Sequence, residues 1–595
     1  MESRSLSPVF GVSSSLSGRA WHWRGGNMEL ESDASGLEND ILRQLLLTRG
    51  VAPEDVTRHI SPTLRDFLPD PAMFQDMETA AERIAQAILG EEKITIYGDY
   101  DVDGATSAAL LIDLLRQLGV EAHYYIPDRL LEGYGPSGEA LVRLAEEGSS
   151  LVVTVDCGAM AFDALEQARA AGLDVIVVDH HKCAAENPPA VALVNPNRLD
   201  ESDEAASHGH LAAVGVAFLL AVALVRALRN RSFFSDEKEP DLMSLLDLVA
   251  LGTVADVAML KSLNRAFVTQ GLKVMARRKR IGMASLIDAS RINRAPQSSD
   301  LGFALGPRIN AGGRVGESTL GVRLLTTQDA DEARDIAAQL SSLNEDRRAI
   351  EAQVQEEAES QILAQGNHAV QVFSGEGWHP GVIGIVAGRL KEKTGKPAFA
   401  IAVDREGGIG KGSGRSISGV DLGAAVIAAR EEGLLLAGGG HAMAAGITIE
   451  SSKLGAFTEF LQDRLANKVD AARASQVLQL DLSIASGGLN PALVEVLEQA
   501  GPFGVGWPAP RIAVGPVRIV KADIVGKDHL RIIAAGEDGK SFKGIAFRAG
   551  ETEMAQTLLH RSKGRRFFLM GRAKIDDWGS RPAAELHLED AAFAD

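Results

Sequence analysis

The most informative stretch of this 595-residue sequence is Ile94-Thr95-Ile96-Tyr97-Gly98-Asp99-Tyr100-Asp101-Val102-Asp103-Gly104. Its apolar, β-branched start predicts a buried strand over 94–97, and the Ala- and Leu-rich run that follows, 105–118, predicts a helix. Three carboxylates therefore lie at the carboxyl end of a strand. Because open α/β sheets bind their ligands at that edge, this stretch predicts both a fold class and a site.

Two further predicted strands end in the same way. The run 151–155 leads into Asp156-Cys157-Gly158, and the run 175–178 leads into Asp179-His180-His181. Short apolar runs that alternate with helical segments are typical of βαβ units, which favours an α/β fold with a parallel, doubly wound sheet. A fourth apolar run, 248–257, carries Asp256 and is interpreted as another acidic strand end.

The acidic residues are too many to lie together without a cation, since carboxylates at close range repel one another. Carboxylate oxygens with one or two imidazoles favour Mg²⁺ or Mn²⁺ over Zn²⁺. Two such ions, about 3.5–4 Å apart, activate a water and stabilise the attacking and leaving oxygens of a phosphoryl transfer. A single Asp of this kind is more often a helix cap or a turn residue. Four acidic sites in one block favour a metal centre with room for two ions.

Outside this block, the pattern of apolar residues changes several times along the chain. An amphipathic run over about 330–365 predicts a connecting helix roughly 50 Å long. Glycine-rich turns and a second α/β pattern follow, and short strands near the carboxyl terminus favour a small barrel. The predicted parts are an N-terminal segment (1–75), a catalytic domain (76–325), a connecting helix (326–366), a smaller α/β domain (367–470) and a barrel (471–595).

The composition limits the function classes. Acidic residues number 80 against 61 basic ones, a net charge of −19, so any contact with nucleic acid must be a localised groove. Only two cysteines are present, which excludes a disulfide framework and a four-thiolate zinc module. The sequence has no uninterrupted apolar run of eighteen residues and no signal-peptide pattern at its start, which predicts a cytoplasmic protein without membrane contact.

The aspartate and histidine motifs resemble those of the DHH phosphoesterase superfamily: Asp101-Val102-Asp103-Gly104, Asp156-Cys157-Gly158, Asp179-His180-His181 and Asp256. The stretch 438–446 resembles the DHHA1 domain that partners DHH domains. The stretches 307–314, 377–384 and 412–416 are similar to those of the superfamily's exonucleases specific for single strands. The stretch 501–508 resembles the OB-fold of these exonucleases, with Trp507 where they usually have Asn.

This resemblance implies a metal-dependent exonuclease that hydrolyses single-stranded DNA to mononucleotides with 5′-to-3′ polarity, in DNA repair and recombination. It implies two Mn²⁺ or Mg²⁺ ions and suggests a single-stranded-DNA-binding protein and a helicase as partners. The implied metal ligands are Asp101, Asp103, Asp156, His180 and Asp256, with Asp156 as the bridge between the ions.

Two neighbouring residues complete the implied site. His181 is expected to contact the scissile phosphate or a ligand. Superfamily members with a His four residues before the first Asp of the Asp-x-Asp pair use it at the first metal, and this chain has Tyr97 there. Either Asp99 compensates as a ligand, or the first metal site is weaker.

The substrate side is predicted from side chains that can hold phosphates or stack on bases. Arg308, Arg314, Arg389, Arg415 and His441 are the expected phosphate contacts. A lone Arg is more often part of a surface ion pair.

The carboxyl-terminal part adds candidates for base stacking. Phe503 and Trp507 are expected to stack on bases along a basic groove, with Phe547 and Phe567 as further candidates, although each of these rings is equally suited to a core. The basic run 277–280 either contacts DNA or is a solvated helix face.

Two other functions remain open at this stage. One is a DHH phosphodiesterase acting on short oligoribonucleotides or cyclic dinucleotides, which the barrel argues against because such small substrates need no long groove. The other is a non-catalytic DNA-binding scaffold on a degenerate fold, which the intact acidic set argues against.

Overall fold

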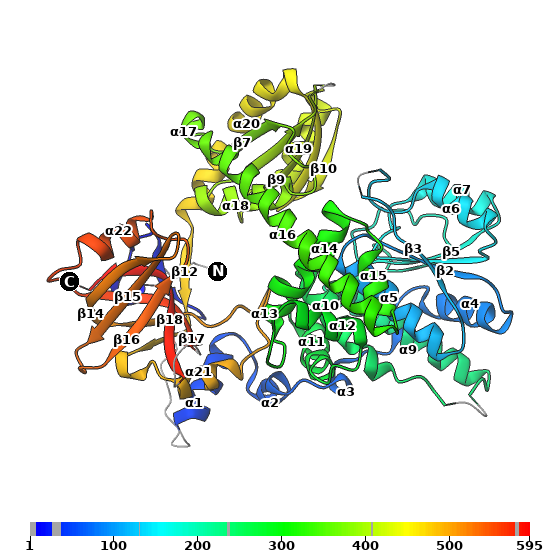
Figure 1. Cartoon of the computed structure of the whole chain (residues 1–595), viewed down its shortest axis with the longest axis horizontal. Helices are drawn as coiled ribbons and strands as arrows, with labels where there is room; N and C mark the ends of the chain where they lie inside the picture. Colours follow the sequence, from blue (N-terminus) through cyan, green and yellow to red (C-terminus); the bar gives the residue numbers. More distant parts are fainter. Residues whose placement is uncertain are drawn as a thin grey trace.

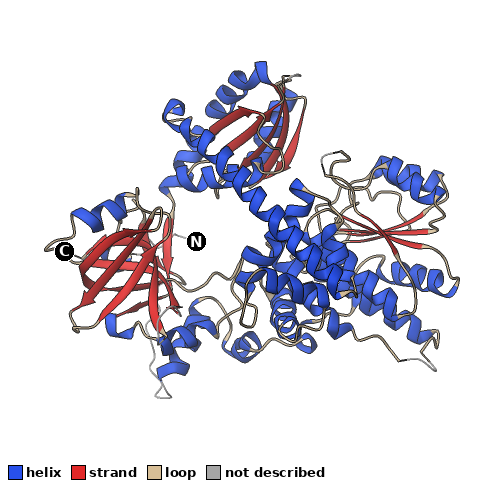
Figure 2. Cartoon of the chain, in the orientation of Figure 1, coloured by secondary structure: helices blue, strands red, loops and turns tan. Residues whose placement is uncertain are grey.

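The computed structural model of the chain describes residues 7–25, 37–129, 131–234, 238–405, 408–576 and 582–594. Three sheet-bearing parts are visible, and a long helix connects the first to the second (Figure 1; Figure 2). Residues 20–23, near the start of the chain, lie against the third part, where they pair with residues 477–480 (Figure 1).

The first part contains a five-stranded sheet in the order β3-β2-β4-β5-β6, and every pairing in it is parallel. Its strands are β2 (Ile94–Gly98), β3 (His123–Tyr125), β4 (Leu151–Val155), β5 (Asp174–Val178) and β6 (Ala192–Val194). The strand order reverses at β2, so the crevice between the ends of β2 and β4 is the switch point where such sheets bind ligands. The predicted parallel, doubly wound sheet is confirmed.

Helices cover both faces of this sheet. Ile96 and Val153 point into a core shared with α4, α5 and α9, whereas Val152 and Val177 point into a second core shared with α6 and α7. The helices of this part are α4 (Met77–Leu89), α5 (Val102–Gln117), α6 (Gly138–Glu146), α7 (Phe162–Ala170), α8 (Asp203–Ala206), α9 (Ala213–Asn230), α10 (Leu246–Ala255), α11 (Ser262–Met275), α12 (Ile281–Ala289), α13 (Ser298–Asp300), α14 (Gly306–Val315) and α15 (Leu320–Thr326). By length and apolarity α9 could cross a membrane, but 78% of its most apolar window is buried inside the protein.

One predicted strand is wrong. The apolar run 248–257 lies mostly in the helix α10, and Asp256 follows that helix as its C-cap residue. An apolar run without a polar face is compatible with either a buried strand or a buried helix, so its periodicity could not decide between them. Residues Leu246–Thr253 are all buried, which explains the missing polar face.

The connecting helix is confirmed as α16 (Ala330–Ser360), which is followed by the short α17 (Ile362–Gln365). Its first half packs Ile336 and Leu340 into the core of the first part, and Val354 and Ala358 belong to the core of the second. One continuous helix therefore contributes to the cores of two parts.

The second part has a five-stranded sheet in the order β10-β11-β9-β8-β7, in which only β7 and β8 are parallel. Its elements are β7 (Gln371–Glu376), α18 (Ile383–Thr394), β8 (Ala398–Val403), β9 (Ile409–Arg415), α19 (Leu422–Glu431), β10 (Ala437–His441), β11 (Ala444–Glu450) and α20 (Leu454–Ala474). The predicted glycine-rich turns are mostly strands, β9 and β10. A Cβ at Gly412 would lie 2.6 Å from Ile447, so close side-chain packing requires glycine there.

The third part is a closed barrel, because β14 pairs with both β15 and β17 while β18 joins β16 to β17. Its elements are β12 (Val477–Leu480), β13 (Leu482–Ile484), α21 (Pro491–Glu498), β14 (Ile512–Val525), β15 (His529–Gly536), β16 (Ser541–Ala546), α22 (Glu553–His560), β17 (Phe567–Asp576) and β18 (Ala583–Phe593). The predicted small barrel is confirmed.

The N-terminal segment is built into the barrel part. It contains β1 (Ala20–Trp23), α1 (Leu37–Thr48), α2 (Val56–Ile60) and α3 (Leu64–Phe67). Strand β1 pairs in parallel with β12, and Leu45 and Leu46 of α1 belong to the core of the barrel. Segments more than 400 residues apart in the sequence therefore fold together.

Candidate metal centre

The turn from β2 into α5 places three carboxylates side by side. Asp99 follows the strand and is 3% exposed. Asp101 is the N-cap of α5, and its Oδ1 accepts hydrogen bonds from the backbone N–H groups of Asp103 (2.8 Å) and Gly104 (3.1 Å). The turn is tight, since a Cβ at Gly104 would lie 2.4 Å from the carbonyl oxygen of Asp99.

Asp103 is fully buried and faces the start of α9. Its Oδ2 accepts from the N–H of Ala213 at 2.6 Å, and its Oδ1 accepts from the N–H of Val214 at 3.0 Å. The positive end of that helix therefore stabilises the ionised carboxylate. Its Oδ2 also lies 3.8 Å from Nε2 of His180.

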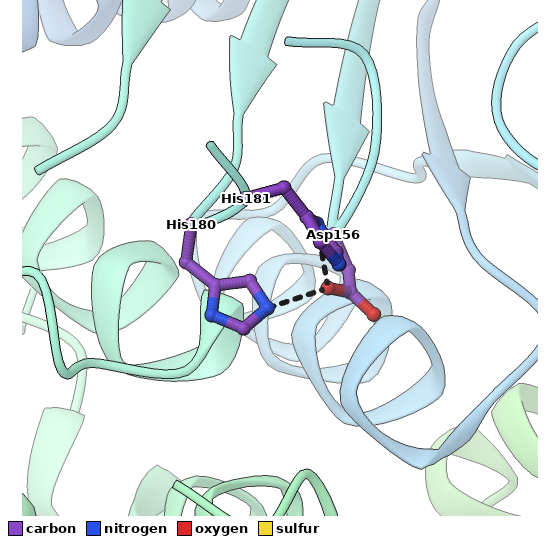
Figure 3. Close-up of side chains that lie close together, drawn as sticks. All are labelled: Asp156, His180 and His181. Atoms are coloured by element: carbon purple, nitrogen blue, oxygen red, sulfur yellow. Dashed lines mark ion pairs between the residues drawn. The ribbon is translucent and has the colours of Figure 1, made fainter. Parts of the chain in front are cut away.

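Asp156 and the two histidines form the centre of the cluster. Asp156 follows β4 with a left-handed φ of 62°, which turns its side chain into the crevice. Its Oδ1 lies 3.2 Å from Nε2 of His180 and 3.9 Å from Nδ1 of His181 (Figure 3). Nε2 of His180 also lies 3.8 Å from Oδ2 of Asp256, which reaches the cluster from the end of α10.

Backbone and side-chain partners fix the orientation of both histidines. Nδ1 of His180 lies 3.0 Å from the carbonyl oxygen of Leu211, which leaves Nε2 directed at the carboxylates. Asp179 accepts hydrogen bonds from the backbone N–H groups of Ala159, His180 and His181, and from Nδ1 of His181 at 2.8 Å. Asp179 thus positions its neighbours rather than facing the cluster.

Burial and mutual repulsion raise the pKa of the clustered carboxyls. Burial and the charge of Asp101 raise the pKa of Asp99 to about 8 and that of Asp103 to about 7. Burial and Asp103 raise the pKa of Asp256 to about 9, and the pKa of Asp156 lies well above its ordinary range for similar reasons. A bound cation would offset the repulsion among these four carboxyls and stabilise their ionised forms.

The two histidines titrate in opposite directions. Burial and the neighbouring His181 lower the pKa of His180 to about 4, so its imidazole is neutral and free to ligate. Burial lowers the pKa of His181, but the hydrogen bond with Asp179 outweighs it and raises the pKa to about 9. His181 is therefore a cationic donor.

The donor atoms fit divalent cations. Three groups of side chains bring one ligand atom each within 4.8 Å of one another: Asp99, Asp101 and Asp156; Asp103, His180 and Asp256; and Asp156, His180 and His181. Oδ1 of Asp99, Oδ1 of Asp156 and Nε2 of His180 are buried and have no hydrogen-bond partner among the residues that the structure describes. Such orphaned atoms are costly unless an ion binds them. All six predicted metal ligands thus lie in one crevice.

Tyr97 points away from this crevice. It is fully buried, and its hydroxyl donates to the carbonyl oxygen of Gly135 at 3.2 Å. Of the two residues considered for the first metal, Asp99 is the one that the fold brings to the cluster.

Two residues in the loop between β3 and α6 were not found by sequence reasoning. The hydroxyl of Tyr134 donates to the backbone carbonyl of Asp156 at 3.2 Å and lies 3.1 Å from Nδ1 of His181. Arg129 stacks over the ring of Tyr100 at 4.9 Å. Neither residue follows a predicted strand, so no local pattern marked them.

The predicted phosphate-contacting arginines fall into two groups. Burial and the charge of Arg129 lower the pKa of Arg314 to about 10, and the same two causes lower the pKa of Arg415. Arg129 therefore lies near both arginines, and Asp101 lies near Arg314. Arg308 donates instead to Oγ of Ser341, and Arg389 pairs with Glu351, both of which lie on α16. His441 is exposed at the end of the edge strand β10.

The barrel aromatics differ in their surroundings. Arg49 and Arg265 pack over the ring of Trp507, and the ring centroid of His59 lies 4.4 Å from that of Trp507. Nε1 of Trp507 donates a hydrogen bond to the carbonyl oxygen of Ala500. Protein groups thus contact the ring of Trp507, which stays partly exposed, and base stacking by Trp507 remains a prediction. Phe567 is fully buried in the barrel core, so its ring is not available to stack on a base.

Phe503 lines a hollow of about 890 Å³ between the first part and the barrel. Its lining includes Ala255 and Val257, the chain neighbours of Asp256, and Lys574 on β17.

Family models match three segments of the chain. They are the DHH family, N-terminal domain, over residues 93–253; the DHHA1 domain over 365–467; and the RecJ OB domain over 480–590. These segments contain the parallel sheet, the second sheet and the barrel, respectively.

Curated relatives match over most of their length. The chain is 39% identical over 520 residues to the single-stranded-DNA-specific exonuclease RecJ of Dickeya dadantii, covering 85% of this chain and 89% of that protein. It is 37% identical over 529 residues to RecJ of Escherichia coli, with the same coverage. For RecJ of Bacillus subtilis the identity is 34% over 560 residues, covering 93% of this chain and 68% of that protein.

Solved structures agree with these matches. RecJ from Thermus thermophilus in complex with Mn²⁺ has a TM-score of 0.75 and 28% identity, covering 96% of this chain and 79% of that chain. An exonuclease RecJ bound to manganese has a TM-score of 0.56 and 34% identity, covering 67% and 97%. A second Thermus thermophilus structure holds Mg²⁺, which agrees with the oxygen-rich ligand set found here. From the three domain matches, the identity along nearly the whole chain and the clustered ligands, it follows that the chain belongs to the RecJ family of single-stranded-DNA-specific exonucleases.

Proposed function

We propose that this protein is a metal-dependent exonuclease that hydrolyses single-stranded DNA from its 5′ end to mononucleotides, in DNA repair and recombination. The observation that carries the proposal is the overlap of the three ligand groups. Asp156 belongs to two of them, and His180 also belongs to two. Shared ligands are what a pair of closely spaced ions requires. The names of the relatives supply the substrate class.

The ligands are assigned as two sets with Asp156 as the bridge. Asp99 and Asp101 would hold one Mn²⁺ or Mg²⁺ ion, and Asp103, His180 and Asp256 would hold the other. The bound ions would supply a nucleophilic water and charge stabilisation for phosphodiester hydrolysis.

The remaining residues of the site bind and orient the substrate. His181, held by Asp179 and Tyr134, is placed to donate a hydrogen bond to the scissile phosphate. Arg314 and Arg415 would hold neighbouring phosphates, together with Arg129.

Residues farther from the ions would contact the rest of the strand. Arg308, Arg389 and His441 would extend the phosphate track, and Phe503 would stack on a base along the hollow that leads to the barrel. The barrel also disfavours a phosphodiesterase for cyclic dinucleotides or very short RNA, since such substrates do not need the hollow.

Three broader assignments accompany this function. We propose that the five sequence-predicted parts act as units, except that residues 1–75 and 471–595 share one core. A single-stranded-DNA-binding protein and a helicase are the proposed partners, because both produce or hold single strands. The proposed location is the cytoplasm.

The test uses purified full-length protein on single strands labelled at the 5′ or the 3′ end. Immediate release of labelled mononucleotide from the 5′-labelled strand, with Mn²⁺ but not with EDTA, is the expected result. Early mononucleotide release from the 3′-labelled strand would reverse the polarity. Cleavage restricted to dinucleotides or cyclic dinucleotides would replace the exonuclease with the phosphodiesterase.

A further inference from the structure

The turn between α11 and α12 carries a concentration of positive charge that the proposed function does not use. Residues 271–295 include seven basic side chains and one acidic one, in a chain whose net charge is −19. The basic residues are Lys273, Arg277, Arg278, Lys279, Arg280, Arg291 and Arg294. Such a local excess is an electrostatic footprint for a polyanion.

The last residue of the basic run anchors the turn. Arg280 is largely buried and pairs with Asp113 and Asp247, while it also donates to the carbonyl oxygen of Leu325. Arg278 adopts a left-handed φ of 54° and pairs with Asp288 on α12. The contacts of Arg280 and Arg278 therefore hold the turn in place. The basic run 277–280 is not a uniformly solvated helix face.

Four side chains on this fixed surface are exposed and have no acidic partner. Among the described residues, no carboxylate lies within 4 Å of Lys273, Arg277, Lys279 or Arg291. We call these four the basic surface. Arg294, in contrast, pairs with Asp300. Unpaired cations keep their full charge for a ligand outside the chain.

The basic surface borders two adjoining hollows. One, of about 640 Å³, is lined by Arg278, Arg291 and Arg294, and the other, of about 140 Å³, is lined by Lys273, Arg277 and Lys279. The larger hollow shares Pro296 with the hollow beside Asp256. The basic surface thus adjoins the hollow along which the proposed function places the single strand.

The chemistry of the lining identifies the ligand. Sites for single strands combine cations with aromatic rings on which bases stack. The described residues that line these two hollows include no aromatic side chain, whereas the hollow beside Asp256 has Phe303, 81% exposed, and Phe503. Cations without stacking rings suit a backbone whose bases are already paired.

We propose that the basic surface binds the phosphate backbone of a DNA duplex that adjoins the single strand under degradation. Attraction to phosphates is independent of sequence and positions the nucleic acid without reading it. This contact would hold the enzyme on a duplex with a single-stranded 5′ extension. It rests on the proposed function for the presence of the single strand and for its path along the hollow that Phe503 lines.

The test compares two DNA ligands in EDTA, which prevents hydrolysis. One is a short single strand, and the other is the same strand continued at its 3′ side by duplex. The variant is Arg277→Gln/Lys279→Gln/Arg291→Gln. Wild-type protein should bind the duplex-bearing ligand more tightly. The variant should lose that gain, and its salt slope on this ligand should fall by about 0.9 for each lost phosphate contact, about 2.7 for three contacts.

A matched control separates a local contact from a change of net charge. Arg464→Gln/Lys468→Gln/Arg473→Gln removes the same charge from exposed positions on α20 and should keep the gain from the duplex. The single variant Arg277→Gln should lower the slope by about 0.9, which keeps the test valid if the triple variant does not fold.

Several outcomes would overturn the proposal. They are an equal affinity of wild-type protein for both ligands, an unchanged duplex gain in the triple variant, and an equal loss on the single strand alone, which would make the surface a single-strand site. Failure of the proposed function is seen separately, as absence of single-strand hydrolysis in Mn²⁺ by the wild-type protein.

Discussion

Asp156 is the residue on which both proposed ion sites depend, because its carboxylate belongs to two of the three ligand groups. We expect Asp156→Ala to abolish hydrolysis and to leave the fold intact. Without metal the substitution removes a buried carboxyl whose raised pKa reflects burial and repulsion, so thermal stability should hold or rise. Turnover at saturating Mn²⁺ and a melting curve without metal check this. Near-normal turnover would refute the bridging assignment.

His441 tests the other side of the site, since it comes from the second sheet and lies in none of the ligand groups. His441→Ala should weaken binding of a single strand about tenfold, the effect of losing one charge-assisted hydrogen bond. Calorimetric titration should show unchanged Mn²⁺ affinity. A fall in Mn²⁺ affinity would contradict a phosphate-binding role separate from the ions.

At the scale of elements, α11 joins the first part to the barrel part and to the N-terminal segment built into it. Arg265 is 1% exposed and donates to the carbonyl oxygens of His59, Ala500, Gly501 and Pro502, which connects the first part to α2 and to the chain before β14. The ring of Trp507 packs against the same arginine. We call these contacts of Arg265 the joint. They hold the backbone of residues 500–502, directly before Phe503, which lines the hollow.

His59 makes the joint sensitive to pH. Burial and the charges of Arg265 and Arg49 lower its pKa from 6.5 to about 3, and its Nε2 is buried without a partner. Since the folded state holds the neutral form, the unfolded state binds more protons below pH 6.5, and stability is lost as the pH falls from 6.5 toward 3. The contribution of His59 to the free energy of unfolding should therefore fall between pH 7 and pH 5.

The variant His59→Phe keeps a ring against Trp507 but cannot be protonated. Its loss of stability over the same pH range should be smaller by about 1 kcal/mol, after allowance for solvent screening at this half-buried site. Chemical denaturation of both proteins at the two pH values measures the difference. Parallel pH profiles would exclude His59 as the source.

At the scale of the whole molecule, the barrel cannot be removed by a single cut. A chain that ends at residue 475 would retain Trp21, Leu45 and Leu46, which are fully buried against the barrel part. Such a protein should aggregate through its exposed apolar surface. A chain over 53–475, without either piece, should remain soluble, and light scattering distinguishes the two.

The soluble 53–475 chain should cleave short oligonucleotides, because every proposed metal ligand lies within it. It should bind long single strands about fivefold more weakly or worse, since one lost stacking base costs about 1–3 kcal/mol. Its salt slope should be shallower by about 0.7 for each lost phosphate contact. Equal affinity and equal slope with the full chain would favour a phosphodiesterase for short substrates.

Local sequence patterns were sufficient for the parallel sheet and for most of the metal centre. Asp101, Asp156 and His180 follow strands whose β-branched runs are short and interrupted by clear breaks, and parallel strands bring their carboxyl ends to one edge. Asp256 was placed in the cluster by the strand-end interpretation and by the motif, and only the motif gave a correct reason for it. Its surrounding run was misread as a strand, because a helix buried on all sides has no polar face to mark its period.

The tertiary structure alone decided the features that depend on pairing between distant segments. The joining of β1 to β12, the packing of Arg49 and Arg265 on Trp507, and the approach of Arg129 to Arg314 all bring together residues far apart in the chain. No periodicity or spacing in the sequence encodes such contacts, since they arise when separate cores pack together. For the same reason the sequence marked the basic run 277–280 but not its rigidity, which comes from the burial of Arg280 against Asp113 and Asp247.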